Sequence, residues 1–398
     1  MPNSAVPAVV LAAGEGRRLA PLTHRRPKPM LPVANRPLLE YVVSAVATAG
    51  IDRLVLVVGH RQERIRNHFG DGDDWNVSIE YVEQSTRLGT AHAVSRVEGV
   101  VDGPFLVLNG DRIVDPELIQ RTRSRLLEDG APVVSVTPSE HPSEYGVVEL
   151  DGERVVSIEE KPHAAGTTAL INAGVYGFDP AIFDAIAETP QRAGELGITT
   201  TLSAYIESGS ISAIRYRGTW LDVSNLWDLL YVTAASIDAE AFDTAGDEPV
   251  RETVSAHETA AIADDVVLGS NVRIGPNATV GGATALGDNA TVGANAVVSN
   301  AVVLSDAVIE DGAIVRDAIV GESAHVGANT TIPGGSATVV VENEVHEDVA
   351  FGGVIGDTAT VGGGVTVDPG TIVGDGARID DGANVGGHVE TDAVVRRG

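Results

Sequence analysis

The sequence contains no cysteine, and lysine occurs only twice among its 398 residues, against 25 arginines. Without cysteine the chain can form no disulfide, thiolate metal site or thiol nucleophile. It also lacks any run of 18 apolar residues, so we expect no membrane-spanning helix. The first apolar run, Ala5 to Ala13, follows no basic segment and continues into a glycine loop, which predicts a strand and not a signal peptide. We therefore expect a cytoplasmic protein without a membrane partner.

Acidic residues far outnumber basic ones, and the formal net charge is −29. Residues 1–235 carry 21 basic and 30 acidic residues, whereas residues 236–398 carry 6 and 26, and this contrast indicates two domains. Because 43% of the residues are hydrophobic, the chain can bury a core and is not disordered. Dense carboxylates with almost no lysine resemble the proteins of halophilic archaea, whose surfaces stay hydrated in salt. Nucleic acid is not expected as a partner, because a field of this sign repels phosphate backbones.

Strand patterns alternate with helix patterns over residues 1–235, which predicts a mostly parallel sheet covered by helices. Ligands of such folds bind at the carboxyl ends of the strands. Residues 146–178 predict antiparallel strands. The expected strands are Val6–Ala12, Leu54–Val58, Val77–Val82, Phe105–Leu108 and Pro132–Thr137, and the expected helices are Pro37–Thr48, Gln62–Phe69, Thr90–Val97 and Pro116–Leu127.

After a polar linker at residues 236–259, apolar residues recur every six positions, as at Ile262, Leu268, Ile274 and Val280. A period of six fits neither a helix nor a flat strand. It predicts a left-handed parallel β-helix over residues 260–398, with apolar side chains inside and small residues at the corners. The phase slips near residues 304–320, and residues 333–351 lack the repeat, so we expect a loop that leaves the coil there.

The two lysines stand beside prolines, in Arg26-Pro27-Lys28-Pro29 and in Glu159-Glu160-Lys161-Pro162. A chain that uses arginine almost everywhere else is expected to need an ammonium group at these places. Arginine offers a planar fork, whereas lysine offers a compact, mobile charge that suits a phosphate oxygen. Lys28 and Lys161 are therefore the first candidates for a phosphate site.

A glycine loop precedes Lys28 and runs from Leu11 through Gly14 and Gly16 to Arg18. Glycines let backbone N–H groups approach phosphates closely. The loop is not a P-loop, because the Gly-Lys-Ser/Thr ending is absent, and it lacks the three glycines of a dinucleotide fingerprint. Gly-x-Gly followed by an arginine and then by Pro-Lys is more specific than any of these features alone.

The loop and the lysine motif resemble the signature of the sugar-1-phosphate nucleotidylyltransferases. The whole chain is similar to archaeal members with a C-terminal β-helix, which are akin to bifunctional acetylglucosamine-1-phosphate uridylyltransferases and to glucose-1-phosphate thymidylyltransferases. The resemblance implies a Rossmann-like α/β domain followed by a left-handed parallel β-helix. It also implies transfer of UMP or dTMP from UTP or dTTP to a sugar-1-phosphate, with Mg²⁺ as cofactor and pyrophosphate as the second product.

The resemblance further implies a role for each matching residue. Gln84 would read the base. Most of these residues also have an ordinary structural interpretation, such as a turn for Asp111, a helix cap for Asp222 and a loop hydrogen bond for Gln84. The implied catalytic residues are Arg18, Lys28 and Lys161; the nucleotide site is Leu11, Ala12, Ala13, Gly14, Gly16, Gln84, Gly89 and Thr90; the sugar site is Gly146, Glu160 and Asn172; and the metal ligands are Asp111 and Asp222.

The chemistry agrees with this set of residues. Nucleotidyl transfer joins two anions, so positioning and neutralisation of charge do most of the work. Magnesium prefers oxygen ligands and keeps several waters, so two aspartates and phosphate oxygens suffice. The sugar phosphate is itself the nucleophile, which fits the absence of a Ser/His/Asp or Cys/His set.

The sequence leaves two alternatives open, and the first concerns the β-helix. Its bifunctional relatives transfer acetyl groups with a histidine base, but the stretch before Gly327-Ala328-Asn329-Thr330 that would carry this base contains Glu310-Asp311-Gly312. His325, His346 and His388 remain as substitutes. We expect the coil to serve as a scaffold for a homotrimer. A non-catalytic subunit that binds nucleotide sugars is the other alternative, and the joint presence of Arg18, Lys28, Asp111 and Asp222 argues against it.

Overall fold

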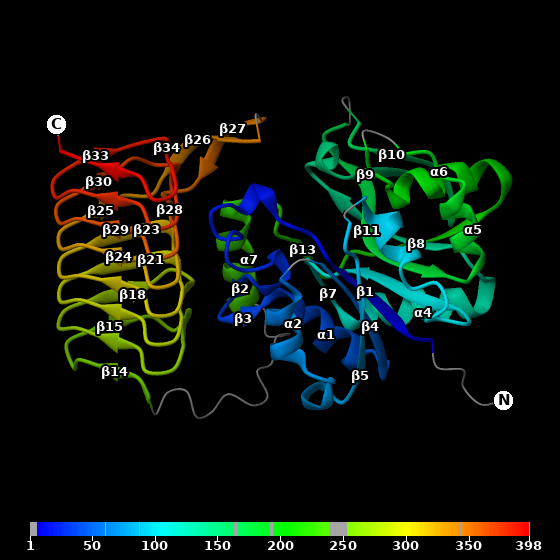
Figure 1. Cartoon of the computed structure of the whole chain (residues 1–398), viewed down its shortest axis with the longest axis horizontal. Helices are drawn as coiled ribbons and strands as arrows, with labels where there is room; N and C mark the ends of the chain where they lie inside the picture. The colour runs from blue at the N-terminus through cyan, green and yellow to red at the C-terminus, as the bar shows by residue number, and fades with distance from the viewer. Residues whose placement is uncertain are drawn as a thin grey trace. The chain divides into compact units, whose positions relative to one another are not determined.

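The computed structural model describes residues 6–59, 61–86, 88–162, 166–191, 194–238, 253–342 and 344–397. The chain forms two compact units, drawn with their elements in Figure 1. The first comprises Met1–Glu15, Pro27–Met30 and Leu38–Asp222, and the second comprises Gly16–Arg26, Leu31–Pro37 and Val223–Gly398. The predicted domain boundary at residue 235 stays a prediction, and most of the predicted linker lies outside the described residues.

A sheet in the order β5-β4-β1-β6-β11-β8-β12-β10-β9 forms the first unit. Its first four strands are parallel, and nearly all their apolar residues are buried, as in sheets that helices cover on both faces. Strand β11 runs antiparallel to β6 and β8, which confirms the antiparallel strands expected over residues 146–178. The strands are β1 Ala8–Ala12, β4 Arg53–Val58, β5 Ser78–Glu83, β6 Phe105–Asn109, β8 Val133–Ser139, β9 Gly146–Asp151, β10 Arg154–Glu160, β11 Ala169–Phe178 and β12 Ile211–Arg215.

The helices of the first unit follow their expected positions. Helix α4 begins at Pro116, which suits the first helical turn, and Gly130 follows its end at a φ of 83°. Alternate residues of β1 face two separate cores, since Val9 packs in one and Val10 in the other. No helix within the described ranges is long and apolar enough to cross a membrane. The helices are α1 Leu38–Thr48, α2 Gln62–Phe69, α3 Thr90–Ser95, α4 Pro116–Asp129, α5 Ala181–Ala187 and α6 Ile198–Ser208, with short 3-10 turns at Lys28–Met30, Asp73–Trp75 and Pro142–Glu144 and a small pair of strands, β7 Arg112–Val114 and β13 Trp220–Asp222.

The second unit is a parallel β-helix, which confirms the prediction from the six-residue repeat. One face is an eight-stranded parallel sheet, and the other two faces share strands β21 Val297–Val303 and β23 Ile314–Val320. The faces consist of β14 Ser255–Ala256, β17 Arg273–Ile274, β20 Thr291–Val292, β22 Val308–Ile309, β24 His325–Val326, β29 Thr360–Val361, β32 Arg378–Ile379 and β35 Val394–Val395; of β15 Ala261–Ile262, β18 Thr279–Gly281, β25 Thr331–Ile332, β30 Thr366–Val367 and β33 Asn384–Val385; and of β16 Val266–Leu268, β19 Thr284–Leu286, β28 Gly353–Ile355, β31 Thr371–Val373 and β34 His388–Val389.

The phase slip of the repeat has a simple geometric cause. In the earlier coils Arg273 pairs with Thr291. In the next two coils Thr291 pairs with Val308 and Val308 with His325, so each of these coils is one residue shorter. The lost residue moves the six-residue pattern out of phase without breaking the strand ladder.

The stretch without the repeat forms a hairpin of β26 Ser336–Val341 and β27 Glu344–Ala350, antiparallel to each other. The predicted loop therefore leaves the coil as expected, but it is itself regular structure. The second unit also contains η1 Arg17–Leu19, β2 Pro32–Val33, β3 Arg36–Pro37 and α7 Leu226–Asp238.

We expect Ile309→Ala to destabilise the β-helix by about 2–5 kcal/mol, because the side chain is fully buried in its core. The same substitution at Ile262, which is 37% exposed, should change the free energy of unfolding by less than about 0.5 kcal/mol. Urea unfolding followed by circular dichroism measures both. Equal effects of the two variants would contradict the assigned core.

Candidate functional site

The order of the parallel strands creates a crevice in the first unit. Strands β1 and β6 are neighbours, and the sheet grows from β1 toward β4 and from β6 toward β11. Ligands of such sheets bind at the carboxyl ends of the strands where the order reverses. The turn after β1 begins with Ala13, and the turn after β6 contains Gly110, where a Cβ atom would lie 2.8 Å from the carbonyl oxygen of Leu11. Only glycine allows the turn after β6 to come so close to the backbone of β1.

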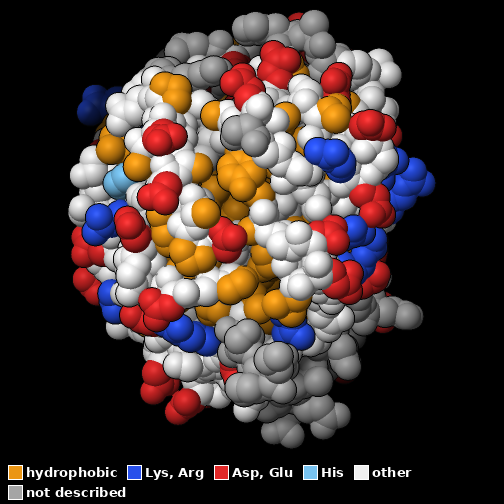
Figure 2. All heavy atoms as spheres, turned by 90° about the vertical axis from the view of Figure 1, so that its right-hand side faces the viewer, with side chains coloured by type: hydrophobic (Ala, Val, Ile, Leu, Met, Phe, Trp, Pro, Cys, Tyr) orange, Lys and Arg blue, Asp and Glu red, His pale blue; other side chains and the backbone are white. Residues whose placement is uncertain are grey.

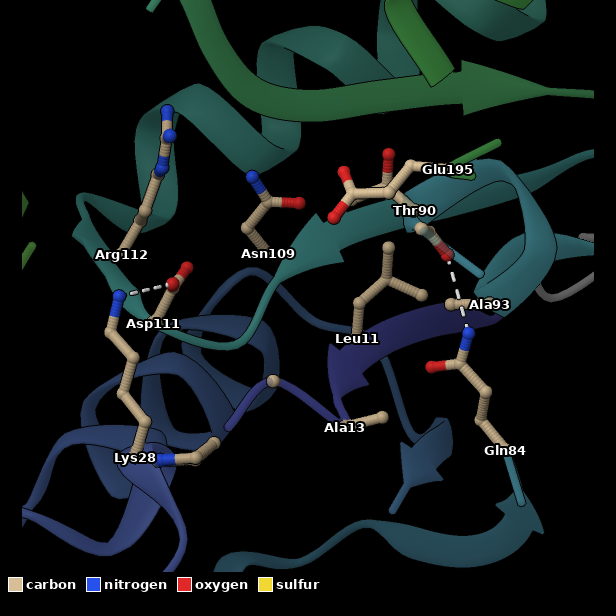
Figure 3. A pocket seen from close by; sticks show the side chains of 13 residues that line it. Leu11, Ala13, Lys28, Gln84, Thr90, Ala93, Asn109, Asp111, Arg112 and Glu195 are labelled. Carbon is tan, nitrogen blue, oxygen red and sulfur yellow. Dashed lines mark hydrogen bonds and ion pairs between the residues drawn. The ribbon is translucent and has the colours of Figure 1, made fainter. Parts of the chain in front are cut away.

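A pocket of about 340 Å³ lies at these strand ends. Figure 3 shows Lys28 and Asp111 at one end of it and Gln84 and Thr90 at the other. Most of the residues predicted to bind the nucleotide are therefore brought together. The pocket is lined by Leu11, Ala13, Gly14, Lys28, Pro29, Gln84, Gly89, Thr90, Ala93, Asn109, Asp111, Arg112 and Glu195.

An ion pair joins Lys28 to Asp111 at one end of the pocket. The Nζ atom of Lys28 lies 2.6 Å from Oδ2 of Asp111, and the lysine side chain is only 11% exposed. Burial opposes the charge of Asp111, but Lys28, Arg112 and the hydrogen bond from Lys28 hold its pKa below the ordinary value. The carboxylate therefore stays ionised. A phosphate oxygen that enters the pocket can replace it as the partner of the Lys28 ammonium group.

Gln84 is buried at the other end of the pocket. Its Nε2 donates to the carbonyl oxygen of Gly89 at 3.2 Å and lies 2.9 Å from Nδ1 of His92. These contacts fix the amide so that its oxygen lies on the side of Ala13 (Figure 3). Burial and the nearby Arg96 keep the pKa of His92 below its usual value, which favours the neutral ring as an acceptor.

The loop before α3 is tied to the segment before α6. Gly89 has a φ of 104°, and a Cβ atom there would lie 2.5 Å from the carbonyl oxygen of Leu196. The backbone N–H of Leu196 donates to the carbonyl oxygen of Leu88, and that of Ile198 donates to Oγ1 of Thr90 at 2.9 Å. This junction carries Glu195 into the pocket lining, a residue that the sequence analysis missed.

The three residues predicted for the sugar form a separate cluster. Gly146 and Glu160 are partners across β9 and β10, and a Cβ atom on Gly146 would lie 3.2 Å from Oε2 of Glu160 and 3.6 Å from Cβ of Asn172. Asn172 is buried, donates to the Tyr176 hydroxyl at 2.7 Å and accepts from the N–H of Gly174 at 3.1 Å. These three residues do not belong to the lining of the pocket described above.

Arg112 connects the sugar cluster to the pocket, and the sequence analysis missed it too. Its Nη1 donates to the carbonyl oxygen of Asn172 at 3.1 Å, and its Nε lies 3.8 Å from Oδ1 of Asp222. The guanidinium lies 5.3 Å from the Tyr145 ring and 5.0 Å from the Trp220 ring, within reach of cation–π attraction. Its position directly after Asp111 was the one signal that could have pointed to it.

The two predicted metal ligands lie on neighbouring backbones. Asp222 pairs with Arg112 across β13 and β7, and Asp111 directly precedes Arg112. Two carboxylates beside a phosphate site fit Mg²⁺, which prefers oxygen and retains waters. Among the described residues no three His, Cys, Asp or Glu side chains gather into a metal site, so phosphate and water would have to complete the coordination.

The remaining predicted residues lie elsewhere. Arg18 is in η1, and Gly16 is the residue directly before that turn. Both residues belong to the second unit. Ala12 is buried within β1. Lys161 is exposed after β10, with a φ of 44°, and its N–H donates to the carbonyl oxygen of Tyr145 at 3.0 Å. The pocket lining therefore includes neither Arg18 nor Lys161.

We expect Gly89→Ala to weaken binding of a nucleoside triphosphate to this pocket at least tenfold, because the new methyl group meets backbone and strains the loop beside Gln84. Gly99→Ala is the matched control, since Gly99 has a φ of 79° but no atom within 4 Å of an added Cβ. It should affect stability alone, by about 1–2 kcal/mol. Isothermal titration with UTP measures both, and unchanged affinity in Gly89→Ala would contradict the assignment of this loop.

Comparison with known proteins places this arrangement in a family. Residues 7–238 match the model of the Nucleotidyl transferase family, and residues 262–351 match the GMPPB C-terminal domain. The first match covers more than half of the chain, so the chain belongs to the nucleotidyl transferase family, a class with the α/β fold described above.

Several curated relatives share the first part of the chain. The Bifunctional protein GlmU of Methanococcus maripaludis strain S2 is 34% identical over 226 residues, which are 56% of this chain and 52% of that protein. The low-salt glycan biosynthesis nucleotidyltransferase Agl11 of Haloferax volcanii is 37% identical over 56% of this chain and 63% of its own. The glucose-1-phosphate thymidylyltransferase of Streptomyces antibioticus is 38% identical over 58% and 66%. The chain thus spans about half the length of the GlmU proteins that it matches.

Solved structures agree on the fold of this part. A Bacillus anthracis protein described as a glucose-1-phosphate thymidylyltransferase, in complex with sucrose, is 26% identical, with a TM-score of 0.55 over 59% of this chain and 96% of its own. A UDP-glucose pyrophosphorylase complexed with UDP-glucose is 25% identical, with a TM-score of 0.51 over 58% and 97%.

Proposed function

We propose that this protein transfers UMP or dTMP from a nucleoside triphosphate to a sugar-1-phosphate and releases pyrophosphate. The observation that carries this proposal is the pocket with the Lys28–Asp111 pair at one end and the fixed Gln84 amide at the other. The family and the names of the relatives support it.

The reaction requires little covalent chemistry from the protein. A phosphate oxygen of the sugar-1-phosphate attacks the α-phosphorus of the triphosphate, the bond from that phosphorus to the bridging oxygen breaks, and pyrophosphate leaves. Lys28 leaves Asp111, binds a phosphate oxygen and offsets the negative charge that the two anions bring together. Gln84 hydrogen-bonds the base and keeps the α-phosphate in line with the attack.

We further propose that Mg²⁺ is the cofactor and that Asp111 and Asp222 hold it. The bound ion would neutralise phosphate charge and orient the triphosphate. Asp111 is ionised and lines the pocket. The nearly buried Asp222 side chain lies beside Arg112, the residue that follows Asp111, with Oδ1 of Asp222 3.8 Å from Nε of Arg112. Arg18 and Lys161 would add positive charge for the phosphates, as the family resemblance implies.

We expect Asp111→Asn to lower kcat more than 100-fold, since loss of an essential charge-stabilising group typically costs about 3 kcal/mol or more. Asp129→Asn is the matched control, because that carboxylate pairs with Arg125 at 2.9 Å away from the pocket. Pyrophosphate release at saturating Mg²⁺ measures both. Activity of Asp111→Asn within tenfold of the unmodified protein would rule out the metal assignment.

The base and the sugar can be identified with one panel. Gln84 can pair with uracil or thymine, so UTP and dTTP should react and ATP and CTP should not. Each triphosphate is combined with glucose-, acetylglucosamine- or mannose-1-phosphate in molar salt, and pyrophosphate is measured. Asn172→Ala should raise the KM for the sugar phosphate more than that for the triphosphate, because it disrupts the cluster with Gly146 and Glu160. The opposite order would contradict the sugar assignment.

Acetyl transfer by the β-helix is a second candidate, and a specific pair of residues favours it. Nε2 of His325 lies 2.9 Å from Oε1 of Glu310, and Oε2 of Glu310 accepts the N–H of Ala328 at 2.9 Å. A carboxylate that orients an imidazole suits a general base. Turnover of acetyl-coenzyme A that is lost in His325→Ala would support this activity, and its absence in the unmodified protein would exclude it.

The remaining proposals concern the whole molecule. We propose a homotrimer formed through the β-helix in the cytoplasm of a salt-loving archaeon, supported by the parallel coils and the acidic composition. Figure 2 shows both acidic and basic side chains on the face that it draws. Sedimentation equilibrium in molar salt tests the trimer.

A further inference from the structure

A buried arginine holds part of the glycine-loop region against the β-helix. Arg26 ends the segment Gly16–Arg26, which belongs to the second unit. Its side chain is only 4% exposed, and Nη2 lies 2.8 Å from Oδ2 of Asp357 and 2.8 Å from Oε2 of Glu322. Nη1 donates to the carbonyl oxygen of Leu22 at 3.3 Å. A guanidinium held by two carboxylates and a carbonyl group can take few other positions.

One of the carboxylates that bind Arg26, that of Asp357, is itself held by the backbone of the coil. The N–H of Glu322 donates to Oδ1 of Asp357 at 2.8 Å, and the N–H of Asp357 donates to Oδ1 of Asp375 at 2.8 Å. Oδ2 of Asp375 lies 3.0 Å from Nδ1 of His24. Three acidic residues on successive coils thus form a ladder at one corner, and two side chains of the Gly16–Arg26 segment bind to it.

Burial and charge make this contact specific. Asp357 is 1% exposed, and burial raises its pKa while Arg26 opposes the rise. Without Arg26, two aspartates would remain buried beside each other on neighbouring coils. Buried charges of this kind are tolerated when they are paired and hydrogen-bonded.

A second contact lies on the other side of Lys28. Nδ2 of Asn35, in the segment Leu31–Pro37, donates to the carbonyl oxygen of Leu286 in strand β19 at 2.7 Å. The chain between these two contacts returns to the first unit only for Pro27–Met30. Lys28 therefore stands on a four-residue segment whose neighbours on both sides are bound to the coil.

We propose that Arg26 is a positioning residue, through which the acidic corner of the β-helix holds the chain that carries Lys28 for the transfer reaction. This inference rests on the proposed function, and it gives the β-helix a role in catalysis other than acyl transfer. Arg26 touches no substrate in this role and acts through Lys28, two residues away.

The test uses the full chain with the variants Arg26→Met, Arg26→Lys, Asp357→Asn and the double variant Arg26→Met/Asp357→Asn. Arg125→Met is the control, since Arg125 makes two ion pairs at 2.9 Å in the first unit. We expect Arg26→Met to lower kcat at least tenfold, with a smaller change in the KM for UTP, and Arg26→Lys to fall between it and the unmodified protein. The control should change kcat less than twofold.

The double variant separates positioning from stability. Removing both charges spares the fold an unpaired buried carboxylate, so its thermal midpoint should lie above that of Arg26→Met. If Arg26 only stabilises the fold, kcat will recover together with the midpoint, and the proposal is overturned. If Arg26 positions Lys28, kcat will stay low although the midpoint rises. Should Arg26→Met fail to fold, kcat and the thermal midpoint are compared between Asp357→Asn and Arg26→Lys instead.

Hydrogen exchange supplies a readout that does not depend on turnover. Arg26→Met should speed amide exchange in the peptide that contains Lys28 and Met30, while peptides from strands β21 and β23 keep their protection. Unchanged exchange around Lys28 would overturn the proposal even if the unmodified protein proved inactive. If the unmodified protein shows no turnover but its Lys28 peptide is protected from exchange without nucleotide, only the proposed function is refuted.

Discussion

The contact between the ammonium group of Lys28 and the carboxylate of Asp111 is the interaction around which the site is organised. It joins a 3-10 turn that precedes β2 to the turn after β6, although 83 residues separate the two in the sequence. Without a substrate, each charge compensates the other in a pocket where neither could stay unpaired at low cost. With a phosphate in place, the same lysine and carboxylate would serve the anion and the metal. The structure therefore already contains the charges that the proposed reaction requires.

The β-helix depends on a different constraint, the alignment of equivalent positions on successive coils. Because the coils are nearly equal in length, each side chain lies above its equivalent in the previous coil, and a whole column shares one environment. The interior column is apolar, and columns at the corners carry residues such as Asn289 and Asp306, which adopt positive φ and hydrogen-bond to each other at 3.0 Å. The column of Glu322, Asp357 and Asp375 uses the same alignment to gather acid where Arg26 and His24 bind.

Much of the fold could be predicted, because periodicity reports burial locally. The apolar run in Phe105–Asn109 and the repeat that includes Ile274 and Val280 reveal which side chains face a core before any tertiary contact is known. The hairpin of β26 and β27 escaped prediction as regular structure, since it interrupts a strong repeat over a short stretch. In the site, Lys28, Asp111, Gln84 and Gly89 were found through their motifs, whereas Glu195 enters the pocket only through the contact between Leu88 and Leu196.

The sequence by itself determined the two architectures and the family resemblance, and it supplied the candidate residues for its chemistry, because each shows in spacings of a few residues. Only the tertiary structure decided which of them meet. It brought Gly146, Glu160 and Asn172 into one cluster, where the Arg112 side chain donates to the carbonyl oxygen of Asn172. It also assigned Gly16–Arg26 to the unit that contains the β-helix. The physical reason is that a buried charge such as Arg26 is stabilised by partners far along the chain, as the 2.8 Å contacts with Glu322 and Asp357 show, and no local pattern encodes such a contact.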